Sequence, residues 1–234
     1  MQRIPGMKLG LALLALLTPI GAEPAARLEA QRATMDFPLT LDLKAWRAAR
    51  PVPAAVDPFG KPAGPGGQFE IRTLWTPQYL YFLFSCPYDS LYLKPNPVTK
   101  TETNKLWEWD VAEVFVGGDP ANIYHYRELQ VSPQGEWVDL DIDRKNPKPE
   151  GGWKWDSGFE SAAKIDAAKK IWYGAMKIPF AAIHGQAAQP GQEFPINIYR
   201  LTGAPPNRKS TMWTPVHQRS HHTPEQFGRM VLGR

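Results

Sequence analysis

The chain has 234 residues, of which 43% are hydrophobic and 21% are charged, so it is long enough for one domain with a buried core, and wholesale disorder is excluded. The net charge of +4 falls to +2 without residues 1–22, which carry Arg3 and Lys8 and no acidic residue. Because no run or stripe of Lys and Arg occurs, we expect no nucleic-acid partner. Cys86 is the only cysteine, which excludes an internal disulfide.

The first 22 residues are typical of a secretory signal peptide. Arg3 and Lys8 precede the apolar run LGLALLALLTPIGA, which ends in small residues and is short for a membrane span. We expect cleavage after Ala22 and a secreted or periplasmic protein with no membrane attachment after cleavage; an uncleaved anchor is the alternative. The polar, Ala-rich residues 23–36 are predicted to be a flexible linker, followed by a single domain at 37–234.

Residues 37–70 are rich in Pro and Gly and are predicted to form a long loop with one short helix around 43–49. Two strands are expected at 68–75 and 79–86, joined by a tight turn at TPQ. The second of these strands is apolar on both faces, which predicts a central strand that is covered on both sides.

Further strands are expected at 109–116, on either side of the SPQG turn at 132–135, and in four later segments. These segments are WKWDSGFESAAKID, KKIWYGAMKIPF, EFPINIYRLTG and FGRMVLG. Pro179 is expected to open a short helical turn. Many closely spaced strands and no internal repeat predict an all-β fold, an antiparallel β-sandwich of the jelly-roll or immunoglobulin-like kind, with long loops and one or two short helices.

The stretch KLWEWDVAEVFVGG, residues 105–118, places a carboxylate among aromatic rings. In a strand, Trp107, Trp109 and Glu113 would share one face, and the small apolar residues between them would face the core. Burial of an unpaired carboxylate costs on the order of several kcal/mol, and a cleft open to a polar ligand removes that cost. Indole rings fit the C–H face of a sugar and a carboxylate fits its hydroxyls. Simple packing, with Glu113 bonded to a neighbouring Arg, is the alternative.

Five segments in order resemble the family 9 carbohydrate-binding modules, within the wider group of DOMON-like sandwiches: LWEWDVAEVFV, YRELQVSPQGEWVD, IWYGAMKIPF, FPINIYR and MWTPVHQRSHHTPEQFGRMVL. The resemblance covers residues 37–234. It implies a module without catalytic activity that binds a mono- or oligosaccharide or the end of a polysaccharide, in support of a secreted glycoside hydrolase. It also implies that Trp107 and Trp213 hold the sugar between them, that Glu113 accepts hydrogen bonds from its hydroxyls, and that Arg127 and Arg200 lie in strands that carry polar ligands.

Other functions stay open as alternatives. DOMON-like relatives can hold haem between Met and His, and Met176 or Met212 with His217 would imitate that pair. The simpler interpretation of HQRSHH is a mobile loop with exposed imidazoles. A scaffold or interaction domain that has lost sugar binding is a further alternative.

The carboxylates of DLDID, residues 139–143, do not fit an EF-hand, because Arg144 takes the position of the required Gly. We therefore expect no cofactor and interpret these residues as a solvated strand face; a structural calcium of another geometry is the alternative. An enzyme is not expected, because no nucleophile or nucleotide-binding motif occurs and spacing alone pairs no two carboxylates as glycosidases require.

Overall fold

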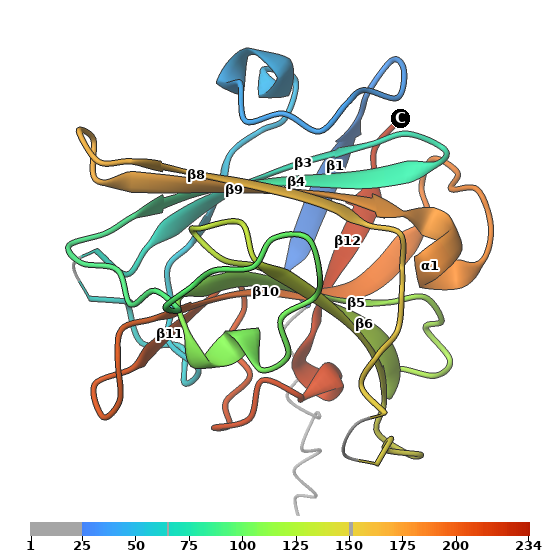
Figure 1. Ribbon diagram of the computed structural model, residues 1–234. Coiled ribbons are helices and arrows are strands. Elements are labelled where there is room, and N and C mark those ends of the chain that lie inside the picture. The colour runs from blue at the N-terminus through green and yellow to red at the C-terminus, as the bar shows by residue number, and fades with distance from the viewer. Residues whose placement is uncertain (1–24, 65, 150–151) are drawn as a thin grey trace, which may run out of the picture.

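The computed structural model describes residues 25–64, 66–149 and 152–234, which form a mostly β structure (Figure 1). The predicted signal peptide, residues 1–22, lies outside the described residues. The strands are β1 (Arg27–Arg32), β2 (Val52–Ala54), β3 (Phe69–Trp75), β4 (Tyr79–Pro87), β5 (Val111–Gly117), β6 (His125–Val131), β7 (Trp137–Asp143), β8 (Glu160–Asp166), β9 (Ile171–Pro179), β10 (Glu193–Thr202), β11 (Lys209–Met212) and β12 (Gly228–Leu232).

The helical segments in the described ranges are short. Three are 3-10 turns, η1 (Leu43–Trp46), η2 (Leu106–Glu108) and η3 (Pro224–Gln226), and α1 (Phe180–His184) is a single short α-helix. None of these helices has the length and apolar character needed to cross a membrane. The helical turns predicted near residues 43–49 and after Pro179 are both present, as η1 and α1.

The described strands form one mixed sheet in the order β7-β6-β5-β10-β12-β1-β3-β4-β9-β8, with β11 beside β10 and β2 beside β3. In Figure 1 the sheet folds into two facing layers, with β3, β4, β8 and β9 above and β5, β6 and β10 below, while β1 and β12 run between them. The predicted all-β class is confirmed. The antiparallel sandwich of jelly-roll or immunoglobulin-like topology is not confirmed, because this sheet is mixed and nearly closed, like a barrel.

Strand β1 corrects the prediction of a flexible linker at residues 23–36. It pairs in parallel with β12 and, further along, with β3, and these are the parallel contacts that make the sheet mixed. Leu28 and Ala30 are buried in the core, whereas Arg27 and Glu29 are exposed and Gln31 is half-buried. This alternation is the pattern that a strand with one buried face requires, so the segment belongs to the folded domain.

The hairpin of β3 and β4 confirms the predicted central strand. β4 pairs with β3 on one side and with β9 on the other. Phe82 and Phe84 lie in the main core between the layers, whereas Tyr81 and Leu83 form a second cluster with Trp46 of η1 on the outside of the upper layer. Both faces of β4 are therefore covered, as its apolar sequence requires.

Replacing Leu28 with Ala tests whether β1 is part of the fold. Because Leu28 is 1% exposed, we expect the free energy of unfolding in urea to fall by about 2–5 kcal/mol. Met35 is 73% exposed in the same predicted linker, so Met35→Ala is the matched control and should change stability by about 0.5 kcal/mol at most. Equal, small effects from both substitutions would contradict a structural role for β1.

Candidate functional site

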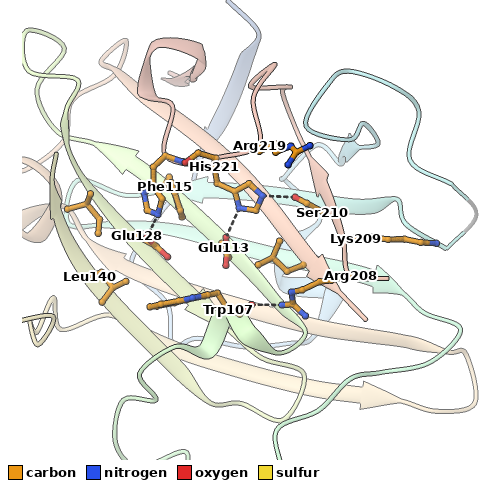
Figure 2. Close-up of a pocket in the computed structure, with 14 residues that line it drawn as sticks. Trp107, Glu113, Phe115, Glu128, Leu140, Arg208, Lys209, Ser210, Arg219 and His221 are labelled. Atoms are coloured by element: carbon orange, nitrogen blue, oxygen red, sulfur yellow. Dashed lines mark hydrogen bonds and ion pairs between the residues drawn. The ribbon is translucent and has the colours of Figure 1, made fainter. Parts of the chain in front are cut away.

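A pocket of about 580 Å³ opens on the face of β5, β6 and β10 that points away from the main core (Figure 2). Strands β5, β6 and β7 supply its floor, and η2, the start of β11 with the loop before it, and residues 219–222 supply its walls. Figure 2 shows Glu113 and Glu128 on the floor, Trp107 on one side and His221 above Glu113.

Strand alternation positions Glu113 in this pocket. Ala112, Val114 and Val116 lie in the main core. Glu113 and Phe115 therefore point to the opposite face, where both line the pocket. This arrangement confirms the predicted sorting of the β5 side chains. Glu113 is only 1% exposed, so its carboxylate lies at the bottom of the pocket.

A second carboxylate shares the floor. In the β5–β6 register, Glu128 lies opposite Phe115 and Gln130 lies opposite Glu113. Glu128 Oε1 accepts a hydrogen bond of 2.6 Å from Gln130 Nε2, whereas Glu128 Oε2 and Glu113 Oε1 are buried and accept none from the described residues. Burial, and then the negative charge of Glu113, raise the pKa of the Glu128 carboxyl well above its ordinary value.

His222 faces Glu128 from the loop above. Its Nδ1 lies 2.7 Å from the Tyr126 hydroxyl and its Nε2 lies 3.8 Å from Glu128 Oε2. Burial raises the pKa of the Tyr126 phenol, so this hydroxyl keeps its proton, and the His222 tautomer sets which of the two groups donates. Burial, followed by the charges of His221 and Arg144, lowers the pKa of His222 to about 4. The imidazole is therefore neutral near pH 7.

His221 takes the matching position above Glu113. Its ring stacks on Tyr199 with a centroid distance of 4.8 Å, and its Nε2 lies 2.9 Å from the Ser210 hydroxyl. Its Nδ1 is 3.8 Å from Glu113 Oε2. The interpretation of HQRSHH as a mobile loop is therefore wrong for its last two histidines, whose half-buried rings are held in fixed contacts.

Trp107 forms one wall of the pocket from η2, not from a strand as predicted. Arg208 holds this turn in place, because its Nη2 donates to the carbonyl oxygens of Trp107 and Trp109. The Trp107 ring packs only in part against neighbouring apolar residues, so part of its surface remains open to the pocket. Trp109 instead stacks on Tyr92 at a centroid distance of 4.6 Å and does not line the pocket.

Of the five predicted site residues, the pocket brings together Trp107 and Glu113. Trp213 packs against the main core on the other face of the layer, and its backbone N–H donates to the carbonyl of Ile198. Its ring lies so close to Gly228 that a Cβ on that residue would come within 2.5 Å of it. The two tryptophans therefore do not face each other across one pocket, and the predicted pair of rings around a sugar is not formed.

Arg127 and Arg200 also lie outside the pocket. Arg127 pairs with Asp141, and Arg200 is buried and donates to backbone carbonyl oxygens of the loop before β3. Strand alternation turns both side chains away, because their immediate neighbours, Glu128 and Leu201, line the pocket.

Sequence reasoning did not single out most of the polar side chains that line the pocket around Glu113. They are Glu128, Arg208, Ser210, His221 and His222. Glu128 could have been found from the register of β5 and β6, but the sequence alone does not set that register. The other four come from loops and strand ends, which carry no periodic signal.

The carboxylates of DLDID do not form a uniformly solvated face. Asp139 is buried and its Oδ2 accepts a hydrogen bond of 2.7 Å from the Ser157 backbone N–H, so the predicted exposure is wrong at this residue. Asp141 contacts Arg127 and Lys148. Within the described ranges, no three His, Cys, Asp or Glu side chains are arranged as a metal site.

The family model described as "Carbohydrate family 9 binding domain-like" matches residues 42–234. The chain belongs to this family. This membership agrees with the resemblance of the five sequence segments to the family. The matched residues include every element from η1 to β12. A comparison with curated proteins found no match.

Solved structures share the fold of this chain. A protein from Bacteroides uniformis ATCC 8492, described as a candidate carbohydrate-binding protein, matches with a TM-score of 0.72 and 14% identity over 89% of this chain and 99% of its own. A family 9 carbohydrate-binding module from Caldicellulosiruptor kristjanssonii matches with a TM-score of 0.66 and 12% identity. This match covers 89% of the present chain and 95% and 97% of the module in its complexes with cellotriose and glucose, respectively.

The depressed pKa of His222 can be measured directly. In an NMR titration of the native protein, we expect its ring signals to change with a midpoint of about 4, whereas in urea the midpoint should return to about 6.5. Because the folded-state pKa is the lower one, the unfolded chain binds more protons between these values, so His222 contributes stability above pH 6.5 that is lost as the pH falls toward 4. A native midpoint at 6.5 or higher would contradict the half-buried, neutral imidazole.

Proposed function

We propose that this protein binds carbohydrate without catalysing a reaction, with one sugar unit seated in the pocket between Trp107 and His221. Membership of the family supports sugar binding in general. The observation that carries the assignment to this pocket is the pair of buried acceptor oxygens, Glu113 Oε1 and Glu128 Oε2, with no donor from the described residues. A buried acceptor without a partner costs about 1–3 kcal/mol, and sugar hydroxyls are donors that would remove this cost.

The surrounding side chains suit a sugar in other respects. The open part of the Trp107 ring offers an apolar surface for the C–H groups of a pyranose ring. On the opposite wall, Ser210 and His221 offer groups that can donate or accept hydrogen bonds. One aromatic wall, two acceptors and several mixed groups predict dissociation constants between about 1 μM and 1 mM.

The placement of the two carboxylates favours binding over hydrolysis. Glycosidases place two carboxyl groups on either side of the scissile bond. Glu113 and Glu128 project from adjacent strands onto one floor, so both would contact the same side of a bound sugar. The raised pKa of Glu128 means that this carboxyl accepts hydrogen bonds when ionised and can also donate one when protonated, and a sugar hydroxyl can pair with either form.

The proposal includes export and a partner enzyme. The basic start and short apolar run of residues 1–22 support secretion or transfer to the periplasm. There the protein would hold the sugar chain for a secreted glycoside hydrolase, a role that rests on the family resemblance alone.

Trp107→Ala and Glu113→Gln test this assignment by isothermal titration calorimetry. The wild-type protein would be titrated with soluble gluco-, xylo-, manno- and galacto-saccharides, including glucose and cellotriose. For the sugars that bind, we expect each substitution to weaken affinity about tenfold or more, because one removes the aromatic wall and the other a charged acceptor.

The matched control is Trp155→Ala, which removes an indole that contacts Arg127 outside the pocket and should leave the affinity unchanged. Absence of binding to every sugar, or full affinity in both pocket variants, would contradict the proposed function.

A further inference from the structure

Two further hollows adjoin the central pocket on different sides. The first, of about 450 Å³, shares the segment from Arg208 to Ser210 with the pocket, together with Arg219 and His221. The second, of about 560 Å³, shares Trp107, Leu140 and Ile142 with it. In Figure 2, Trp107 and Leu140 lie on one side of the pocket, and Ser210 and Lys209 lie on the opposite side. The three hollows therefore lie side by side, and we call the three together the long groove.

The first hollow carries an exposed aromatic ring on a well-ordered turn. Phe59 is 52% exposed and lines this hollow. Asp57 fixes the turn, because its Oδ1 accepts hydrogen bonds of 2.9 Å from the backbone N–H groups of Phe59 and Lys61, and its own N–H donates to the carbonyl of Lys61 at 2.7 Å. Because the turn is fixed, the exposed ring loses little conformational entropy when a ligand stacks on it. Such a ring is suited to binding a ligand.

The second hollow carries an indole at the other end of the long groove. Trp153 is half-buried and packs against the same apolar cluster as Trp107. Lys105, Asp143 and Arg144 line the same hollow and supply donors and acceptors. Each flanking hollow therefore combines an aromatic ring with polar groups, as the central pocket does, and this combination fits the C–H faces and hydroxyls of sugar units.

We propose that a glycan chain of at least three sugar units lies along the long groove, with one unit in the central pocket and its neighbours against Phe59 and Trp153. This inference rests on the proposed function of the central pocket. It differs from the family expectation of a site for chain ends, because a further hollow adjoins the pocket beyond the Trp107 wall and another adjoins it beyond the Ser210 wall. The protein then recognises a chain along its length, and a free end is not required.

Affinity as a function of chain length tests the long groove. Gluco-, xylo-, manno- and galacto-oligosaccharides of one to six units would be titrated into wild-type protein, Phe59→Ala and Trp153→Ala. In the series that binds, we expect affinity to rise about tenfold or more from one unit to three or four. We expect each substitution to remove about three- to tenfold of that gain while leaving binding of the monosaccharide unchanged.

Trp155→Ala is again the matched control, since it removes an indole two positions from Trp153 that lines neither the pocket nor the adjoining hollow. A second arm uses oligosaccharides whose reducing end has been opened with borohydride, and binding along the length predicts affinities within about threefold of the untreated chains. Affinity that does not change with length, a length gain that survives both substitutions, or loss of binding after borohydride treatment would overturn the long groove while leaving monosaccharide binding intact. Absence of binding in all four series would instead overturn the proposed function itself, and the groove with it.

Discussion

A buried carboxylate oxygen needs a hydrogen-bond donor, and the pocket floor holds two such oxygens that receive none from the described residues, Glu113 Oε1 and Glu128 Oε2. The other side chains of the site lie around these two oxygens without donating a hydrogen bond to them. The two histidines stand above the carboxylates at 3.8 Å, close enough for electrostatic contact but beyond the range of a hydrogen bond. On the side of Glu128, the neutral imidazole of His222 supplies no positive charge that would favour the ionised carboxylate. A ligand rich in hydroxyl groups supplies the missing donors.

The fold keeps this arrangement rigid by placing its central groups on strands. Glu113 and Glu128 project from adjacent strands whose other faces, at Val114 and Leu129, are buried in the main core. Side chains fixed in this way keep their geometry better than side chains on loops. The walls are added by loops, but these are also tied down: Arg208 bonds to the carbonyl oxygens of the Trp107 turn. The sheet therefore sets the floor of the pocket, and hydrogen bonds between loops set its walls.

The sequence predicted features that depend on local pattern. Alternation in WDVAEVFV correctly separated Glu113 from the core residues Ala112 and Val114, and the two apolar faces of residues 79–86 correctly predicted a covered central strand. The predictions that were wrong concern pairing between distant segments. The segment RLEAQR was expected to be a linker, because its two apolar residues are too few to indicate a strand without β3 and β12 beside them.

The dependence on pairing between distant segments also explains why several of the predicted binding residues were wrong. Trp213 was expected beside Trp107, but a tryptophan in a polar-looking loop can point to either face of a sheet, and only the pairing with β10 turns it toward the core. His221 and His222 were interpreted as exposed, because their partners Tyr199 and Tyr126 lie far away in the sequence. Local composition therefore indicated the kind of ligand, whereas the identity of the residues around it depended on tertiary contacts.

A crystal structure of the complex with a bound saccharide tests the central claim most directly. The account predicts sugar hydroxyls within about 3.2 Å of both Glu113 Oε1 and Glu128 Oε2, with a sugar ring lying against Trp107. A saccharide bound elsewhere on the protein, with both carboxylate oxygens still lacking a donor from it, would contradict the account.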